Sequence, residues 1–266
     1  MKILSLKKIL KPTKMSKEEK KNMLIYSFSG LLLLSLITFA GVKNNGRVID
    51  KVKVEILEHD GIFFTDQLEV VDLMTDKSAD YVIGVEMGNL EPKILEERVE
   101  ANPFVKDAQV YRDLKGNLQV KVKQSKPIAR LFIDGMNDRY IDSDGRVLPV
   151  NAKHTARVPL METDFEFGWE KNLNESKYGT QVFELLKYIE KDAFWKAQIA
   201  HIFIKKDGEI EIYPQVTKQV ITFGMPVDLD SKFSKLMTFY KEILPKKGWN
   251  TYDRVNLKFE NQIICE

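Results

Sequence analysis

The chain has 266 residues, of which 44% are hydrophobic and 30% are charged, and this composition excludes an intrinsically disordered protein. The net charge of +2 is unevenly distributed: residues 1–22 carry +6, residues 23–42 carry no charge, and residues 43–266 carry −4. Because the basic residues of the long acidic part are dispersed, the sequence excludes the basic surface that a nucleic-acid partner would require.

Residues 23–42 are long and apolar enough to form a transmembrane helix. Twenty helical residues span about 30 Å, which is the thickness of the hydrocarbon core. Eight lysines precede this segment, and only Lys43 and Arg47 follow it closely, so the N-terminus is expected in the cytoplasm and the C-terminal part outside it. A cleaved signal peptide is the alternative, but the long apolar segment and the long basic tail favour a retained anchor.

Residues 43–126 are expected to form a small α+β domain that begins with a polar linker. Apolar residues at every second position predict strands, and apolar residues at helical spacing predict helices. The second helix is expected to begin at Pro92, where a first helical turn tolerates proline. In chain order, the expected elements are a strand over Val52–Ile56, helices over Thr65–Met74 and Pro92–Ala101, and a hairpin with strands at Ala108–Val110 and Leu118–Val122.

Residues 127–266 are expected to form a mainly antiparallel β domain with two helices, because short turns separate most of the strands. The helices are expected at residues 176–190 and from Ser231 to Pro245, where the proline and Gly248 end the second one. The strands are expected at residues 131–133, 139–141, 147–150, 199–205, 209–213, 219–223 and 254–264.

No catalytic, cofactor-binding or metal-binding motif is apparent. The sequence contains no GxSxG nucleophile motif, no glycine-rich phosphate loop and no HExxH zinc motif. His59, His154 and His201 lie far apart, and His201 is expected to be an ordinary sheet residue. The turn at Asp142–Gly145 has only part of the ligand set of a calcium-binding loop. An enzyme, a cofactor and a metal site are therefore not expected.

Other conspicuous side chains are interpreted as structural. The acidic residues of turns and helix faces are expected on solvated surfaces: Asp142, Asp144, Glu96 and Glu97. The tryptophans are expected in the core or at an interface: Trp169, Trp195 and Trp249. Cys265 is the only cysteine, which excludes an intramolecular disulfide. It is interpreted as an unreactive residue at the end of a strand, with an intermolecular disulfide or a modified thiol as alternatives.

These features favour a tethered binding module over an enzyme. The strand expected at residues 254–264 could lie at a sheet edge, where unpaired backbone groups accept a partner strand. An internal strand with both edges paired is the alternative. If the strand is the contact, Leu257→Pro should abolish partner binding with modest damage to the rest of the fold.

Three stretches, in this order behind a membrane anchor, resemble the FtsQ/DivIB family of bacterial cell-division proteins over nearly the whole chain. The first is NPFVKDAQVYR at residues 102–112, continued by LQVKV at 118–122 and KPIA at 126–129. The second is YIDSDGRV at residues 140–147, which resembles the family's Y-(V/I)-D-x-x-G-x-V turn. The third is VNLKF at residues 255–259, which resembles its V-D-(L/M)-R-Y strand.

The third stretch departs from the family pattern, because Asn256, Lys258 and Phe259 replace an acid, an arginine and a tyrosine. Side-chain-specific contacts at this strand are therefore in doubt, whereas backbone pairing needs none of these groups.

The resemblance implies a POTRA domain at residues 43–126 and a β domain at residues 127–266. It implies a non-enzymatic scaffold without a cofactor, located at the division septum, that binds FtsB/DivIC-like and FtsL-like membrane proteins, with septal peptidoglycan synthesis proteins as possible further partners. The contact residues would be those of the last strand: Val255, Leu257, Lys258 and Phe259. A POTRA-bearing component of polypeptide transport or envelope assembly, and a membrane-anchored envelope hydrolase, are the alternatives.

Overall fold

The computed structural model describes residues 16–45, 48–57, 63–76, 81–113, 115–163, 165, 169 and 171–266. His59 and most of the expected basic tail lie outside the described residues. The chain divides into two compact units. One consists of Met1–Val52, Tyr81–Glu91 and Arg112–Leu118, and the other of Lys53–Asp80, Pro92–Tyr111 and Gln119–Glu266. The domain boundaries expected from the sequence, after residues 42 and 126, stay predictions.

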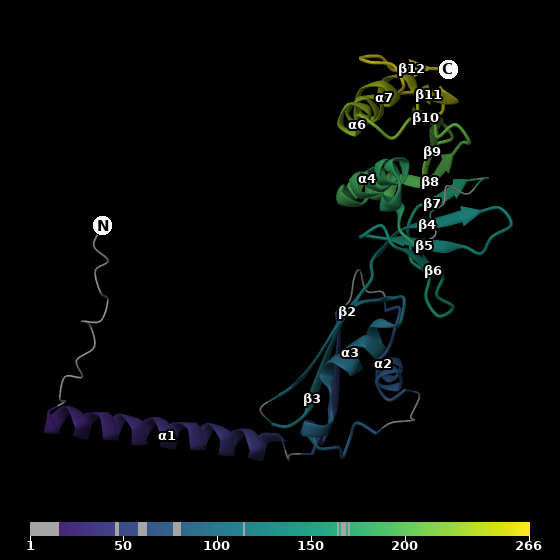
Figure 1. The fold of residues 1–266 in the computed structure, drawn as a ribbon. Coiled ribbons are helices and arrows are strands. Elements are labelled where there is room, and N and C mark those ends of the chain that lie inside the picture. The colour runs from purple at the N-terminus through teal and green to yellow at the C-terminus, as the bar shows by residue number, and fades with distance from the viewer. Residues whose placement is uncertain are drawn as a thin grey trace, which may run out of the picture. The chain divides into compact units, whose positions relative to one another are not determined.

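Helix α1 (Lys17–Asn45) contains the expected transmembrane segment and is drawn in purple in Figure 1. A reciprocal cap begins it, because the backbone N–H of Ser16 donates to Glu19 and that of Glu19 donates to the Ser16 hydroxyl. Within the described part of the chain, α1 is the one helix long and apolar enough to cross a membrane. Its side chains as far as Phe39 are exposed in the protein, as is expected of a helix that contacts lipid.

The expected order strand–helix–helix–strand–strand is confirmed in the part that follows α1. The elements are β1 (Val52–Leu57), α2 (Gln67–Met74), a short 3₁₀ turn η1 (Met87–Asn89), α3 (Pro92–Glu100), β2 (Val105–Arg112) and β3 (Leu118–Gln124). The strands form a sheet in the order β1-β3-β2. Asp66 caps α2 by accepting from the backbone N–H of Glu69 at 2.8 Å. The two helices bury Val70, Met74, Leu95 and Val99.

The C-terminal part contains a nine-stranded sheet in the order β12-β11-β10-β9-β8-β7-β4-β5-β6 (Figure 1). The strands are β4 (Pro127–Ile133), β5 (Arg139–Asp142), β6 (Val147–Pro149), β7 (Leu160–Thr163), β8 (Ile199–Ile204), β9 (Ile210–Pro214), β10 (Val220–Gly224), β11 (Arg254–Asn256) and β12 (Ile264–Cys265). The α+β class is confirmed, and five of the eight strand pairs are antiparallel.

Three strand pairs are parallel: β4 with β7, β7 with β8, and β10 with β11. Hairpin turns join the antiparallel neighbours, as expected, but longer connections that include helices join β7 to β8 and β10 to β11. Such crossovers return the chain in the same direction and make the strands parallel. Strand β7 was not expected from the sequence.

The helices of this part are η2 (Leu173–Glu175), α4 (Lys177–Lys191), α5 (Ala193–Gln198), α6 (Leu229–Thr238), a π-helical stretch η3 (Phe239–Ile243) and α7 (Leu244–Lys247). Helix α4 confirms the first expected helix. The expectation that Pro245 ends the second is wrong, because this proline lies in the first turn of α7, where its missing N–H is not needed. Gly248, at φ +102°, ends the helix. Helix α5 was not expected from the sequence.

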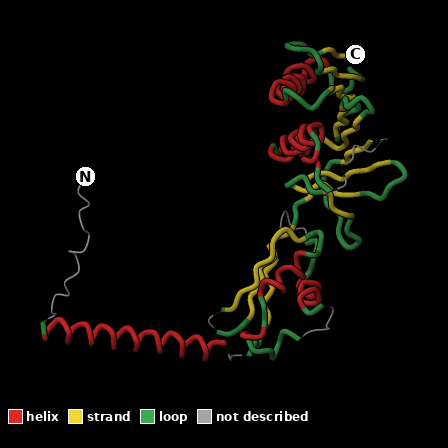
Figure 2. The backbone as a smooth tube through the Cα atoms, viewed as in Figure 1, coloured by secondary structure: helices red, strands yellow, loops and turns green. Residues whose placement is uncertain are grey.

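In the C-terminal part, the helices (red in Figure 2) lie along one side of the strands of the large sheet (yellow). Alternate strand residues such as Ile202, Ile204 and Ile212 are buried in the same core as Leu185 of α4 and Phe233 of α6. Trp169 and Trp195 belong to this core, as expected. Trp249 is 49% exposed.

The expectation that Asp142 lies on a solvated surface is wrong, because this residue is completely buried. Its Oδ1 accepts from the backbone N–H of Asp144 and of Arg146, each at 2.9 Å, and its Oδ2 accepts from the Arg146 side chain at 2.9 Å. The carboxylate therefore stabilises the turn between β5 and β6. Both of its oxygens are occupied, and the described residues contain no cluster of three metal-ligating side chains.

Asp142→Asn should lower the free energy of unfolding by about 3 kcal/mol, because it removes charge-assisted hydrogen bonds in a buried place. Urea unfolding of the full chain in detergent, followed by tryptophan fluorescence, measures this. Asp134→Asn is the control, since Asp134 is exposed. Equal urea midpoints for both variants would contradict a structural role of Asp142.

Candidate partner-binding edge of the large sheet

The two described sheets have four edges, formed by β1, β2, β6 and β12. An uncovered edge presents unpaired N–H and C=O groups that can pair with a strand of another protein. Soluble sheet proteins cover such edges with side chains or loops. Which edges are covered therefore decides where a partner strand can add.

The edge of β2 is covered by two carboxylates of α3. Glu96 Oε1 accepts from the backbone N–H of Val110 at 2.7 Å, and Glu100 Oε1 accepts from that of Ala108 at 3.0 Å. These two amides are therefore engaged within the protein. The expectation that Glu96 lies on a purely solvated helix face is wrong, because the sequence does not reveal that the helix lies beside the strand.

The edges of β1 and β6 also have partners inside the protein. Gln67 Nε2 donates to the carbonyl of Val54 in β1 at 3.2 Å. The backbone N–H of Val147 in β6 donates to the carbonyl of Lys171 at 2.8 Å. Pro149, the last residue of β6, has no N–H to offer.

Strand β12 has an uncovered outer edge. Arg254 and Glu266 exchange two backbone hydrogen bonds at 3.1 and 3.0 Å, and the next pair in the register is Val255 with Cys265. Antiparallel pairs alternate between bonded and non-bonded, so the N–H and C=O of Cys265 point away from β11. No described residue forms a hydrogen bond with these two groups. Ile264 beside them is 37% exposed.

The single strand expected at residues 254–264 is wrong, because β11 ends at Asn256 and a turn separates it from β12. Asn261 lies in this turn at φ +53°, a conformation that asparagine tolerates. Strand β11 therefore lies between β10 and β12, with both edges paired, as in the alternative considered from the sequence.

The four expected contact residues have different positions. Val255 and Leu257 are completely buried in the core. Lys258 is exposed and forms an ion pair with Glu209 at 2.5 Å. Phe259 is 47% exposed. Partner contact through these four residues stays a prediction. Val255 and Leu257 lie in the core and help to position the strands at this edge of the sheet.

Three hydrogen bonds hold the segment after β11 in place. The backbone N–H of Leu257 donates to the carbonyl of Thr222 at 3.0 Å. Lys235 Nζ donates to the carbonyls of Leu257 at 2.8 Å and of Phe259 at 2.6 Å. Leu257→Pro would remove the first of these bonds in the core, so we now expect it to damage the fold as well as partner binding.

Glu211 anchors β11 to the sheet on the face opposite the helices. It accepts from Arg254 at 2.7 Å, Lys205 at 2.9 Å and the Tyr213 hydroxyl at 3.1 Å. Burial acts to raise the pKa of Glu211, but these three donors outweigh it and lower the pKa overall. The carboxylate is therefore charged at neutral pH.

The other residues considered in the sequence analysis, His154, His201 and Cys265, do not form a common site. His154 is exposed. His201 Nε2 lies 2.8 Å from Glu162 Oε2, and the His201 ring stacks on Tyr213. These are the contacts of an ordinary sheet residue. Burial raises the pKa of the Cys265 thiol, which keeps the thiol protonated at neutral pH.

Glu211→Gln should lower stability at neutral pH by about 2 kcal/mol, because it replaces a charged acceptor by a neutral one. A lowered folded-state pKa contributes stability above the unfolded value of about 4.5, and this contribution is lost as the pH falls through the folded value. The difference between wild type and variant should therefore shrink on acidification below that value. Urea unfolding at a series of pH values measures it, and a difference independent of pH would refute this account.

Comparisons with known proteins agree with this architecture. Residues 126–266, more than half of the chain, match the family described as FtsQ/DivIB, C-terminal related. Residues 47–123 match a POTRA-like domain. The cell division protein FtsQ of Rhodothermus marinus is 25% identical over 187 residues, which cover 68% of this chain and 67% of that protein. The chain therefore belongs to the FtsQ/DivIB-related family of cell-division proteins.

Proposed function

We propose that this protein is a non-enzymatic, membrane-anchored scaffold of the bacterial cell-division complex that binds a partner strand on β12. The observation that carries the proposal is the contrast between the edges of the two sheets. Side chains or backbone of the described chain engage the edges of β1, β2 and β6. The outward N–H and C=O of Cys265 on β12 have no such partner among the described residues.

The N-terminal helix supports a tethered role at the cytoplasmic membrane. Lysines are concentrated before the apolar segment at residues 23–42 of α1, which favours a single-pass topology with the folded part outside the cytoplasm. Confinement to the membrane raises the effective concentration of other tethered proteins at this surface. A scaffold whose individual contacts are of modest affinity benefits from such confinement. We expect this protein to be enriched at the septum.

The proposed partners are FtsB/DivIC-like and FtsL-like membrane proteins, which would recruit septal peptidoglycan synthesis proteins in turn. A strand of the FtsB-like partner would pair with Cys265 through backbone hydrogen bonds. The exposed side chains of Ile264 and Phe259 would supply apolar contacts, and Lys258 would supply charge. Val255 and Leu257 would act from the core by fixing the position of the edge.

A role in polypeptide transport or envelope assembly is the alternative, and the POTRA-like match favours it. The match to the cell-division family covers the larger share of the chain. In addition, Glu96 and Glu100 engage the edge of β2, the longest strand of the POTRA-like sheet. These observations support the division scaffold over the alternative.

Cys265→Pro should weaken binding of the FtsB-like partner at least about tenfold, or ~1.4 kcal/mol. Proline removes the outward N–H that a partner strand would use, whereas Ile264 and Glu266 keep the bonds to β11. Cys265→Ala is the matched control, since it removes the thiol and keeps the N–H. Titration of the purified full chain in nanodiscs with the partner measures both.

Equal affinities of the proline and alanine variants would reject β12 as the docking edge. Urea unfolding of the two variants provides the folding control. A proline variant with wild-type stability and weak binding is the expected combination.

Depletion of this protein should give filamentous cells with unseparated septa, because the division complex would lose its scaffold.

A complementing copy with alkaline phosphatase fused after Glu266 should restore division and show phosphatase activity, since that enzyme folds only outside the cytoplasm. Normal division after clean deletion in a strain without a paralogue would count against the proposed function. A fusion that restores division but stays inactive would refute the proposed topology.

A further inference from the structure

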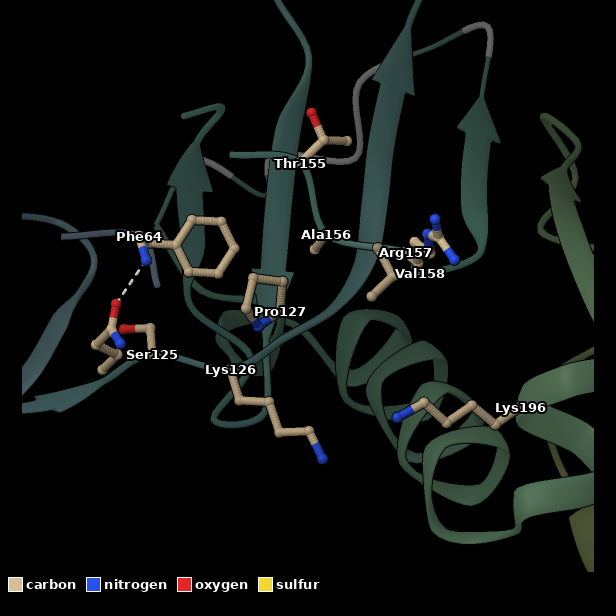
Figure 3. A pocket seen from close by; sticks show the side chains of 10 residues that line it. Phe64, Ser125, Lys126, Pro127, Thr155, Ala156, Arg157, Val158 and Lys196 are labelled. Atoms are coloured by element: carbon tan, nitrogen blue, oxygen red, sulfur yellow. Dashed lines mark hydrogen bonds between the residues drawn. The ribbon is translucent and has the colours of Figure 1, made fainter. Parts of the chain in front are cut away.

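Two lysines that line a cavity beside the segment joining β3 to β4 already have an anionic partner. The cavity has a volume of about 410 Å³, and Figure 3 shows Lys126 and Lys196 among the side chains that line it. Glu190 accepts from Lys126 at 2.6 Å and from Lys196 at 3.0 Å. Both lysines are thus engaged without a ligand. Lysines that lack an anionic partner among the described residues lie elsewhere, in the segments around Trp249.

Trp249 exposes its side chain although its backbone is held in place. The residue is 49% exposed. The side-chain amide of Gln219, which is 1% exposed, donates to the carbonyl of Trp249. The hydroxyl of Thr251 donates to the carbonyl of Lys247 at 2.5 Å, which fixes the turn around the tryptophan. An ordered segment therefore presents the indole ring to the surface.

Two other exposed apolar side chains accompany Trp249. The ring centroid of Tyr240 lies 6.4 Å from that of Trp249 and 5.9 Å from that of Phe194, which is 42% exposed. Val216 is 74% exposed and belongs to the loop after β9 that Gln219 joins to Trp249. Single exposed apolar residues are normal, whereas a group of them marks an interaction site. Phe194, Val216 and Trp249 are called the Trp249 surface below.

The segments that form the Trp249 surface are basic. Residues 215–219 and 241–249 together contain four lysines and one acid. Lys246 pairs with that acid, Glu242, at 3.1 Å. The other three lysines are exposed and form no ion pair with a described residue: Lys218, Lys241 and Lys247. Their attraction extends over a Debye length of ~8 Å at physiological ionic strength, so a bound anion need not contact any particular one of them.

The segment that carries Trp249 leads toward the proposed docking edge. The backbone N–H of Asp253 donates to the carbonyl of Glu266, the residue after β12, at 2.6 Å. A partner chain that pairs with β12 and continues past Glu266 would therefore approach the Trp249 surface. This continuity favours a protein segment over a membrane surface as the occupant.

We infer that the Trp249 surface binds an acidic segment with apolar side chains that flanks the partner strand. Its apolar side chains lie against Phe194, Val216 and Trp249, where a large aromatic ring gains most from desolvation. Its carboxylates are attracted by the lysines that lack an ion pair. The inference rests on the proposed function for the identity of the partner, whereas the recognition chemistry belongs to this surface.

The test uses the full chain in nanodiscs of zwitterionic lipid and the fluorescein-labelled peptide Glu-Leu-Leu-Glu-Glu-Leu-Leu-Glu, with binding followed by fluorescence anisotropy. The matched probe has glutamine in place of every glutamate. The acidic probe should bind saturably and at least fivefold more tightly than the glutamine probe. Equal binding of the two, or no saturable binding of either, would overturn the inference.

Trp249→Ser and Lys247→Gln should each weaken binding of the acidic probe at least threefold and leave the fold intact, because both side chains are exposed. Tyr81→Ser and Lys206→Gln are the matched controls, since these residues are exposed and lie outside the Trp249 surface. Equal losses in variants and controls, or no loss in any of them, would assign the probe to another basic part of the chain and contradict the inference.

An anionic membrane surface is the competing occupant, because lysines and an exposed tryptophan also suit lipid headgroups. Replacing the zwitterionic lipid by phosphatidylglycerol should leave the emission of Trp249 unchanged, measured as the difference between wild type and Trp249→Phe. A blue shift of this emission would assign the surface to lipid and overturn the inference. Cys265→Pro should leave probe binding unchanged, so a failure of the proposed docking edge is distinguishable from a failure of this inference.

Discussion

Backbone N–H and C=O groups at the edge of a sheet need hydrogen-bond partners. The rest of this structure depends on that constraint. An open sheet has two edges, and each edge must be covered or used. Gln67, Glu96 and Glu100 engage the edges of the smaller sheet, and the backbone carbonyl of Lys171 engages that of β6. The outward backbone groups of Cys265 on β12 form no hydrogen bond with a described residue, which is why the proposed function is assigned to this edge.

Carboxylates that accept backbone or buried side-chain donors recur throughout the molecule. Asp142 stabilises the turn between β5 and β6, Glu96 covers an edge, and Glu211 joins β11 to its neighbours. The lowered pKa of Glu211 means that this residue contributes stability in its charged form, so acid weakens the connection of β11 to the sheet. A scaffold needs such a rigid framework, because a strand of two residues such as β12 keeps its register only if β11 is held firmly.

The proposed docking edge on β12 recognises a partner through backbone groups. The edge offers backbone groups and would bind a strand with little dependence on its side chains. The replacement of the family's acid, arginine and tyrosine by Asn256, Lys258 and Phe259 changes side chains around the edge without removing its backbone groups. Strand pairing can thus persist in this chain.

An uncharged apolar segment was sufficient to identify α1, and local periodicity was sufficient to identify α4, the hairpin of β2 and β3 and the hairpin of β8 and β9. All of these signals depend on neighbours in the chain. The resemblance in residues 102–112, 140–147 and 255–259 was sufficient for the family. Only the tertiary structure decided the parallel pairing of β7, the separation of β11 from β12 and the partners of Asp142, Glu96 and Glu211. Each of these depends on which distant segment lies alongside, and spacing within a single segment carries no information about such a neighbour.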